Sequence, residues 1–109
     1  MLFRSFFGPN ARAEVPLAAV VGETVISGRI DRLLVEPGLV RAIDFKTGRS
    51  IPADETKVPT PYLRQMAHYA AALQTIFPES VVEMSLLFTD GPRLIQLSDA
   101  ILAPYKSAS

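Results

Sequence analysis

Residues 24–36 carry the sequence TVISGRIDRLLVE and residues 39–47 carry LVRAIDFKT, with Pro37-Gly38 between them. Both stretches are rich in β-branched and apolar residues, which is typical of β-strands. Proline followed by glycine is a strong turn signal. We therefore predict a hairpin of two antiparallel strands, and this hairpin decides the fold class.

The segments on either side extend the hairpin into a sheet. Residues 13–21 (AEVPLAAVV) predict a preceding strand, and Pro16 favours the edge of the sheet because proline lacks a backbone donor. Residues 81–89 (VVEMSLLFT) and 93–97 (RLIQL) predict two later strands around the turn Asp90-Gly91-Pro92.

A single helix is predicted over residues 60–77, after a polar loop over residues 48–59. Thr60 is a favourable N-cap, Pro61 is favoured at the first helical position, and Pro78 stops the helix. Apolar residues recur at spacings of 4, 3 and 4, which predicts one buried stripe: Met66, Ala70, Leu73 and Phe77. The order β-β-β-α-β-β predicts an α+β domain with a mixed sheet and a helix on one face.

Composition limits the possible classes of protein. The 109 residues suffice for one small domain, and eleven basic and eleven acidic residues give zero net charge. Strong nonspecific DNA binders usually carry a basic excess, so a metal or a larger parent protein must supply the attraction if this chain binds DNA. The absence of cysteine excludes disulfides and thiolate metal sites. No apolar run approaches the ~20 residues that a membrane span requires.

We expect residues 13–97 to form the core of one domain. Residues 1–12 are interpreted as the remnant of a preceding helix or linker, and residues 98–109 as a C-terminal tail. The apolar start MLFRSFF is too short for a signal peptide. We therefore expect a piece of a larger protein, truncated on its N-terminal side.

The hairpin brings charged side chains together. If Pro37-Gly38 form its loop, the numbers of facing residues add to 75, so Asp31 faces Asp44 with Cβ atoms ~5 Å apart. Two facing carboxylates repel, and a divalent cation such as Mg²⁺ or a shared proton would relieve this. Lys46 lies two residues beyond Asp44 and therefore points to the same face. The alternatives are ordinary solvated residues, or a bulge that moves the two aspartates to opposite faces.

Three motifs resemble those of a known family. Residues 28–32 (GRIDR), 44–48 (DFKTG) and 65–69 (QMAHY) are similar, in order and spacing, to motifs of the RecB-like branch of the PD-(D/E)XK nuclease superfamily. The greatest similarity is to the C-terminal nuclease domain of AddA-type helicase–nucleases of bacterial double-strand break repair. The implied fold is a restriction-endonuclease-like mixed sheet.

The resemblance also implies roles for individual residues. Asp31 and Asp44 would bind Mg²⁺, for which Mn²⁺ can substitute, and the backbone carbonyl of Phe45 would be a further ligand. Lys46 would be the catalytic lysine. The helix residues Gln65 and Tyr69 would face the active site or the DNA, although core packing is the alternative for Tyr69 and a solvated position for Gln65.

Three other residues complete the site predictions. Glu14 and Arg29 are further candidates for residues that touch the site. The family usually carries a metal-binding histidine upstream of the first strand, and none is found there. The only histidine, His68, is expected on the surface.

The implied activity is that of a metal-dependent DNA exonuclease domain. It would cut single strands that a helicase motor delivers, in the cytoplasm, together with a second, AddB-like subunit. No phosphate-loop motif occurs, so ATP would bind only to the missing motor region. The alternatives are a catalytically inert, nuclease-derived module that channels DNA, and a metal-free β-rich interaction module.

Overall fold

The computed structural model describes residues 11–106, which form one five-stranded sheet with the order β1-β2-β3-β4-β5. Neighbouring strands are antiparallel except for β3 and β4, which are parallel. The strands are β1 (Ala11–Val21), β2 (Thr24–Glu36), β3 (Leu39–Lys46), β4 (Val81–Phe88) and β5 (Arg93–Leu97). The predicted mixed sheet is confirmed, and β1 lies at its edge.

The parallel pairing of β3 and β4 requires a crossover, which α2 (Thr60–Ile76) supplies. The helix begins at Thr60, so Pro59 occupies the N-cap position and no side chain caps the helix. The prediction that Thr60 is the cap is therefore wrong. Pro61 lies in the first turn. Backbone N–H groups there have no partner within the helix, so a proline costs no hydrogen bond.

Two short helical elements were not predicted. The turn η1 (Glu55–Lys57) lies in the loop before α2, and α3 (Asp99–Lys106) follows β5. Within the predicted tail, Leu102 is 1% exposed, because α3 packs this side chain into the core. Interpreting residues 98–109 as a tail is thus wrong for the part that forms α3.

The predicted remnant at the N-terminus lies largely outside the described residues. Residues 11 and 12 of that segment belong to β1. Residues 107–109, at the other end, also lie outside. No helix in the described part of the chain is long and apolar enough to cross a bilayer.

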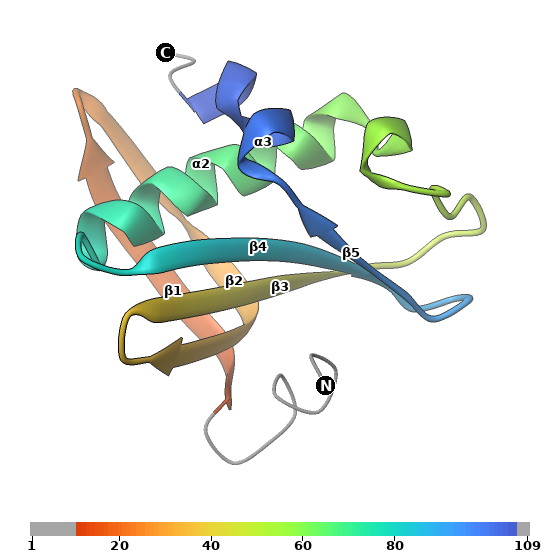
Figure 1. Ribbon diagram of the computed structural model, residues 1–109, viewed down its shortest axis with the longest axis horizontal. Coiled ribbons are helices and arrows are strands. Elements are labelled where there is room, and N and C mark those ends of the chain that lie inside the picture. Colours follow the sequence, from red (N-terminus) through yellow and green to blue (C-terminus); the bar gives the residue numbers. More distant parts are fainter. Residues whose placement is uncertain (1–10, 107–109) are drawn as a thin grey trace.

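The helices α2 and α3 cover the same face of the sheet (Figure 1). The main core lies between this face and the helices, and it draws buried residues from every strand as well as from α2 and α3. Its most enclosed large members are Ile30, Val40, Met66, Leu73, Met84, Leu86 and Leu102. A smaller apolar group, Ile43 and Leu87, lies apart from this core.

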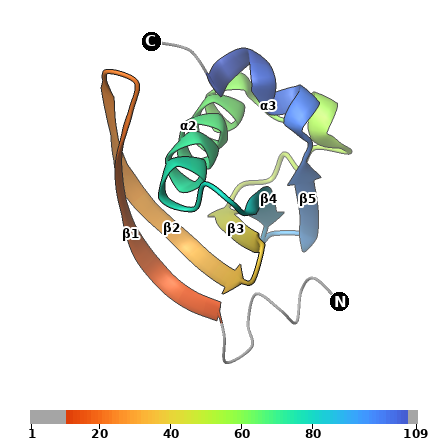
Figure 2. The same ribbon diagram turned by 60° about the vertical axis from the view of Figure 1, so that its left-hand side comes forward.

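The strand β2 changes the face that it turns to the core partway along its length. Ile26 and Ile30, at even positions of the strand, lie in the main core. Leu33, at an odd position, lies there as well. Side chains on a regular strand alternate between faces, so the backbone must twist between Ile30 and Leu33. At the same level the β1–β2 ladder omits the pair Glu14 and Asp31, and Glu14 has a φ of 50°. Figure 2 shows the hairpin of β1 and β2 curving around α2. The twist places Asp31 where the hairpin departs from β3.

Candidate active site

β2 and β3 pair in the predicted register, from Glu36 opposite Leu39 to Arg32 opposite Ile43. The ladder ends one step before Asp31 would face Asp44. Instead, the Asp31 Oδ2 atom accepts a hydrogen bond from the backbone N–H of Phe45 at 2.8 Å. The Asp31 carboxyl nevertheless lies near enough to Asp44 to help raise the pKa of that residue. The structure thus brings the two predicted acids together, through the twist in β2 as well as the hairpin register.

Asp44 occupies an unfavourable place for a negative charge. The residue is only 9% exposed. Burial raises the pKa of Asp44, the Lys46 ammonium opposes this shift, and the neighbouring Asp31 carboxyl raises the pKa further. A site with these properties attracts either a proton or a cation.

The donor set fits a hard divalent cation. No group of three or more histidine, cysteine, aspartate or glutamate residues suited to a metal occurs within residues 11–106. Two carboxylates are nevertheless enough for Mg²⁺, which commonly keeps several waters and binds through one or two carboxylates plus substrate phosphate. Asp31 and Asp44 match this requirement. Phe45 enters the cluster through its N–H, and a role for its carbonyl stays a prediction.

Lys46 is held at the centre of the cluster. Its Nζ atom lies 2.8 Å from Asp44 Oδ2 and donates to Gln65 Oε1 at 2.9 Å. The same atom lies 4.3 Å from the centroid of the Tyr62 ring. The Lys46 side chain is only 15% exposed, and the ammonium is held by these partners.

A polar row continues from Lys46 along α2. Gln65 Nε2 donates to the Tyr69 hydroxyl at 3.5 Å, as their spacing of four residues allows. The Tyr69 ring lies against the backbone of Gly28 in β2, and a Cβ atom at Gly28 would meet Tyr69 Cζ at 2.7 Å. All three motifs of the sequence therefore meet in space: Gly28 and Asp31, Asp44 and Lys46, and Gln65 and Tyr69.

A hollow of about 480 Å³ borders this row, between β2 and α2. Gln65, Tyr69, Arg64 and His68 contribute to its lining. His68 is half-buried, and its Nε2 atom is buried without a hydrogen-bond partner among the described residues. The prediction that His68 is a surface residue is therefore wrong.

Glu14 and Arg29 pair with each other at 3.3 Å, and their side chains are 70% and 64% exposed. The register of the neighbouring pairs would set Glu14 opposite Asp31, but the ladder of β1 and β2 omits this pair. Within residues 11–106, no hydrogen bond or ion pair joins either residue to the acids or to Lys46. Their predicted contact with the site stays a prediction.

Tyr62 is a site residue that was not predicted from the sequence. The Lys46 ammonium makes a cation–π contact with the Tyr62 ring. The centroid of this ring lies 6.4 Å from that of Phe88. The signal was present, because Tyr62 precedes Gln65 by three residues and therefore shares its helical face.

Similarity to known proteins extends over most of this chain. The sequence model of the PD-(D/E)XK nuclease superfamily matches residues 4–106 of this chain. The AddA-type ATP-dependent helicase/nuclease of Moorella thermoacetica is 40% identical over 78 residues, which is 71% of this chain and 5% of that protein. The protein of the same name from Oenococcus oeni is 35% identical over 74 residues, 67% of this chain and 6% of that protein. The chain thus spans only a small part of the length of these relatives.

The fold also has a counterpart among solved structures. The crystal structure of SSO0001 aligns with a TM-score of 0.54 and 23% identity, over 95% of this chain and 52% of the other. Together with the family match over residues 4–106, this likeness identifies the mixed sheet with its helices as the restriction-endonuclease-like fold. With a family match over nearly the whole sequence, this chain belongs to the PD-(D/E)XK nuclease superfamily and is homologous to the nuclease region of AddA-type helicase/nucleases.

Proposed function

We propose that this chain is a magnesium-dependent deoxyribonuclease domain, in which Asp31 and Asp44 bind the metal and Lys46 assists phosphodiester hydrolysis. The observation that carries the proposal is the contact of the Lys46 ammonium with Asp44 at 2.8 Å and with Gln65 at 2.9 Å, beside the interacting acids. Acids whose pKa is raised by burial and by a neighbouring acid, beside a charged partner, are typical of functional sites.

The two carboxylates would hold Mg²⁺ or Mn²⁺, together with the backbone carbonyl of Phe45. When bound, the ion supplies positive charge that neutralises a phosphate oxygen. It would also relieve the repulsion between Asp31 and Asp44, which is the reason that the pair supports a metal site.

Lys46 supplies the second element of the chemistry. Its Nζ atom can donate a hydrogen bond to the attacking water or to an oxygen on which negative charge develops. Gln65 fixes the direction of the ammonium, and Tyr69 fixes Gln65 through its hydroxyl. Such positioning matters because a misplacement of about 1 Å can cost ~100-fold in rate.

The relatives suggest the wider setting. We infer that the chain acts as the nuclease part of an ATP-dependent helicase–nuclease, on single strands of DNA that the motor delivers. ATP would bind to the motor and not to this domain, and an AddB-like subunit would be the partner. The process would be the repair of double-strand breaks by homologous recombination, in the cytoplasm. Because both acids and the lysine are present and in contact, an inert channelling module is the weaker alternative.

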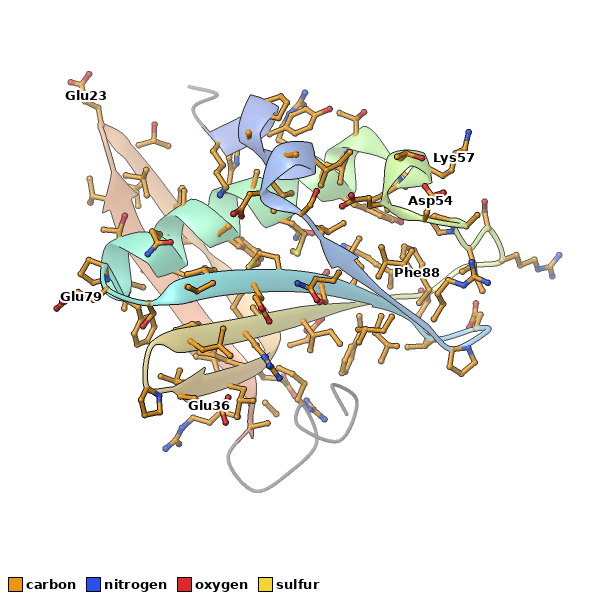
Figure 3. The ribbon with its side chains drawn as sticks, viewed as in Figure 1. Glu23, Glu36, Asp54, Lys57, Glu79 and Phe88 are labelled. Carbon is orange, nitrogen blue, oxygen red and sulfur yellow. The ribbon has the colours of Figure 1, made fainter. Side chains whose placement is uncertain are left out.

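The test is cleavage of single-stranded DNA by the full chain, with and without Mg²⁺. Asp44→Ala and Lys46→Ala should each abolish the metal-dependent cleavage. A matched control is Glu23→Gln, which removes one negative charge at the exposed tip of the hairpin of β1 and β2, away from the cluster (Figure 3).

Metal binding can be tested separately from activity. Mn²⁺ should raise the thermal unfolding midpoint of the unmodified chain and not that of a variant with both Asp31→Asn and Asp44→Asn. A shift that persists in the double variant would place the metal elsewhere, and cleavage that persists in Asp44→Ala would refute the catalytic assignment.

A further inference from the structure

A second hollow, of about 440 Å³, lies where β3 ends. It is bounded by the loop after β3, the start of α2 and the end of β4, and Tyr62 and Phe88 contribute to its lining. Tyr62 connects it to the proposed active site, because the same ring lies 4.3 Å from the Lys46 Nζ atom. A group bound in this hollow is thus a direct neighbour of a group bound at Lys46.

The loop that forms its wall is held in place from behind. Arg93 Nη1 donates to the backbone carbonyls of Pro52 and Ala53 at 3.3 and 3.0 Å. The Glu55 carboxylate accepts hydrogen bonds from the backbone N–H and the hydroxyl of Ser98, at 2.8 and 3.0 Å. At the start of the loop, the N–H of Gly48 donates to Asp90 Oδ2 at 2.8 Å. The hollow therefore has a shape fixed before any ligand arrives, which lowers the entropy lost on binding.

The charge of this lining is one-sided. Arg49 and Lys57 line the hollow, and no acidic residue in the described part of the chain does. Of the two acids of the same loop, Glu55 is engaged by Ser98. Asp54 is exposed, and hydrogen bonds from Thr56, with a smaller contribution from the nearby Lys57 charge, lower its pKa. Figure 3 shows Lys57 and Phe88 at the same end of the molecule. The lining itself thus carries two positive charges and no negative charge, and although Asp54 offsets part of the charge of Lys57, an anion is favoured there.

We propose that this hollow binds the nucleotide next to the cleaved bond, with Arg49 and Lys57 holding its phosphate and the Tyr62 ring packing against its sugar or base. Cationic side chains around aromatic rings are the usual means of holding single-stranded nucleic acid. The inference rests on the proposed nuclease function, because Lys46 defines the position of the cleaved phosphate. Beyond that function, the inference assigns a binding site to one further phosphate of the DNA strand, whose negative charge is needed for tight binding.

The experiment uses the full chain and a single-stranded oligonucleotide in which one phosphate at a time is replaced by a neutral methylphosphonate. With the unmodified protein, one replacement beside the cleaved bond should raise KM about tenfold, the size expected for losing a charged hydrogen-bond partner. Arg49→Gln and Lys57→Gln should each raise KM for the unmodified oligonucleotide and reduce its salt dependence by about one phosphate contact.

The decisive measurement combines both changes. In Arg49→Gln and in Lys57→Gln, the sensitive methylphosphonate should cause a smaller further loss than in the unmodified chain, because one of the two cationic contacts to that phosphate is already broken. The matched control is Lys106→Gln, which removes one positive charge at the end of α3, where Lys106 lies 3.8 Å from Asp99. This control should keep the full methylphosphonate effect.

The outcomes separate the failure of this inference from that of the proposed function. If the substitution and the methylphosphonate reduce binding independently, the phosphate site is wrong, while loss of cleavage in Asp44→Ala still supports the nuclease. A further outcome is that inorganic phosphate inhibits the unmodified chain and not Arg49→Gln, while no single methylphosphonate changes KM. In that case the hollow binds free phosphate and the inference is overturned. If Asp44→Ala still cleaves, the proposed function itself fails.

Discussion

Adding one methyl group at Gly28 should displace Tyr69 and disorganise the polar row that ends at Lys46. The Cβ atom of Gly28→Ala would lie 2.7 Å from Tyr69 Cζ and 2.9 Å from Cε1, with the hydroxyl oxygen closer still. Ordinary carbon contacts are about 3.5–4.0 Å, so the ring must retreat by about 1 Å. Two atoms of a stiff ring and its hydroxyl oxygen are involved, so a rotation of the hydroxyl alone does not relieve the overlap.

The expected loss of stability is that of overpacking, about 1–3 kcal/mol. Tyr69 is half-buried and accepts its hydrogen bond from Gln65 at 3.5 Å, so a shift of about 1 Å breaks this contact. Gln65 then loses one of the groups that aim it at Lys46. If the proposed function is correct, the rate of DNA cleavage should fall about 100-fold, the usual effect of a misplacement of this size.

The assay is a double-mutant cycle with Tyr69→Ala, measured by urea unfolding and circular dichroism. Removing the ring removes the obstacle, so Gly28→Ala should be neutral or slightly stabilising in the Tyr69→Ala background, because alanine has less conformational freedom than glycine in the unfolded chain. The coupling free energy should be about 1–3 kcal/mol. If Gly28→Ala destabilises the chain equally in both backgrounds, the contact between Gly28 and Tyr69 is refuted.

The remaining predictions concern the charged cluster and the elements that pack against it. Asp44→Asn should raise the free energy of unfolding at pH 7 without divalent metal, because the pKa of Asp44 is raised in the folded chain and its ionised form therefore opposes folding. The gain should vanish as the pH falls to 3.8, the ordinary value, and a loss at pH 7 in urea titrations would contradict the argument. Leu102→Ala should destabilise the chain by about 2–5 kcal/mol in the same assay, whereas Ala103→Ser on the exposed side of α3 should change stability by less than about 0.5 kcal/mol. Glu55→Ala removes two hydrogen bonds to Ser98 and should cost about 1–3 kcal/mol. Ser98→Ala also removes two, the one from its hydroxyl to Glu55 and the one that this hydroxyl accepts from the Ile101 N–H, and should cost a similar amount.

Much of the fold followed from local chemistry in the sequence. The turn at Pro37-Gly38 fixed the register of β2 and β3, because a hairpin loop of known length leaves one way to align its strands. Alternation then placed Lys46 beside Asp44. These are short-range relations, and sequence patterns carry them directly.

The features that were missed depend on distant parts of the chain. The helix α3 is short and contains Pro104, and packing of Leu102 against the core holds it in place. Its start did carry a local signal that was overlooked, because the Ser98 hydroxyl accepts a hydrogen bond from the Ile101 N–H as an N-cap does, and Asp99 lies in the first turn. The twist of β2 at Asp31 depends on how β1 and α2 enclose it, and the positive φ of Glu14 has no signal in the residue type. The ordered loop before α2 is fixed by Arg93, which lies 40 residues beyond Ala53.

The chain has no net charge, but its charges near the site are separated: the acidic cluster favours a cation, and the adjoining hollow favours an anion. Asp31, Asp44 and Lys46 together carry a net charge of −1 when ionised, so the cluster alone attracts a cation and repels DNA. The positive charges of Arg49 and Lys57 lie in the adjoining hollow, where they can hold a phosphate without competing for the acids. A strand held there would bring its next phosphate to Lys46 only after a cation has neutralised the acids. Binding of DNA near the site and binding of metal should therefore reinforce each other, and Arg49→Gln should weaken this cooperativity while leaving the metal affinity in the absence of DNA unchanged.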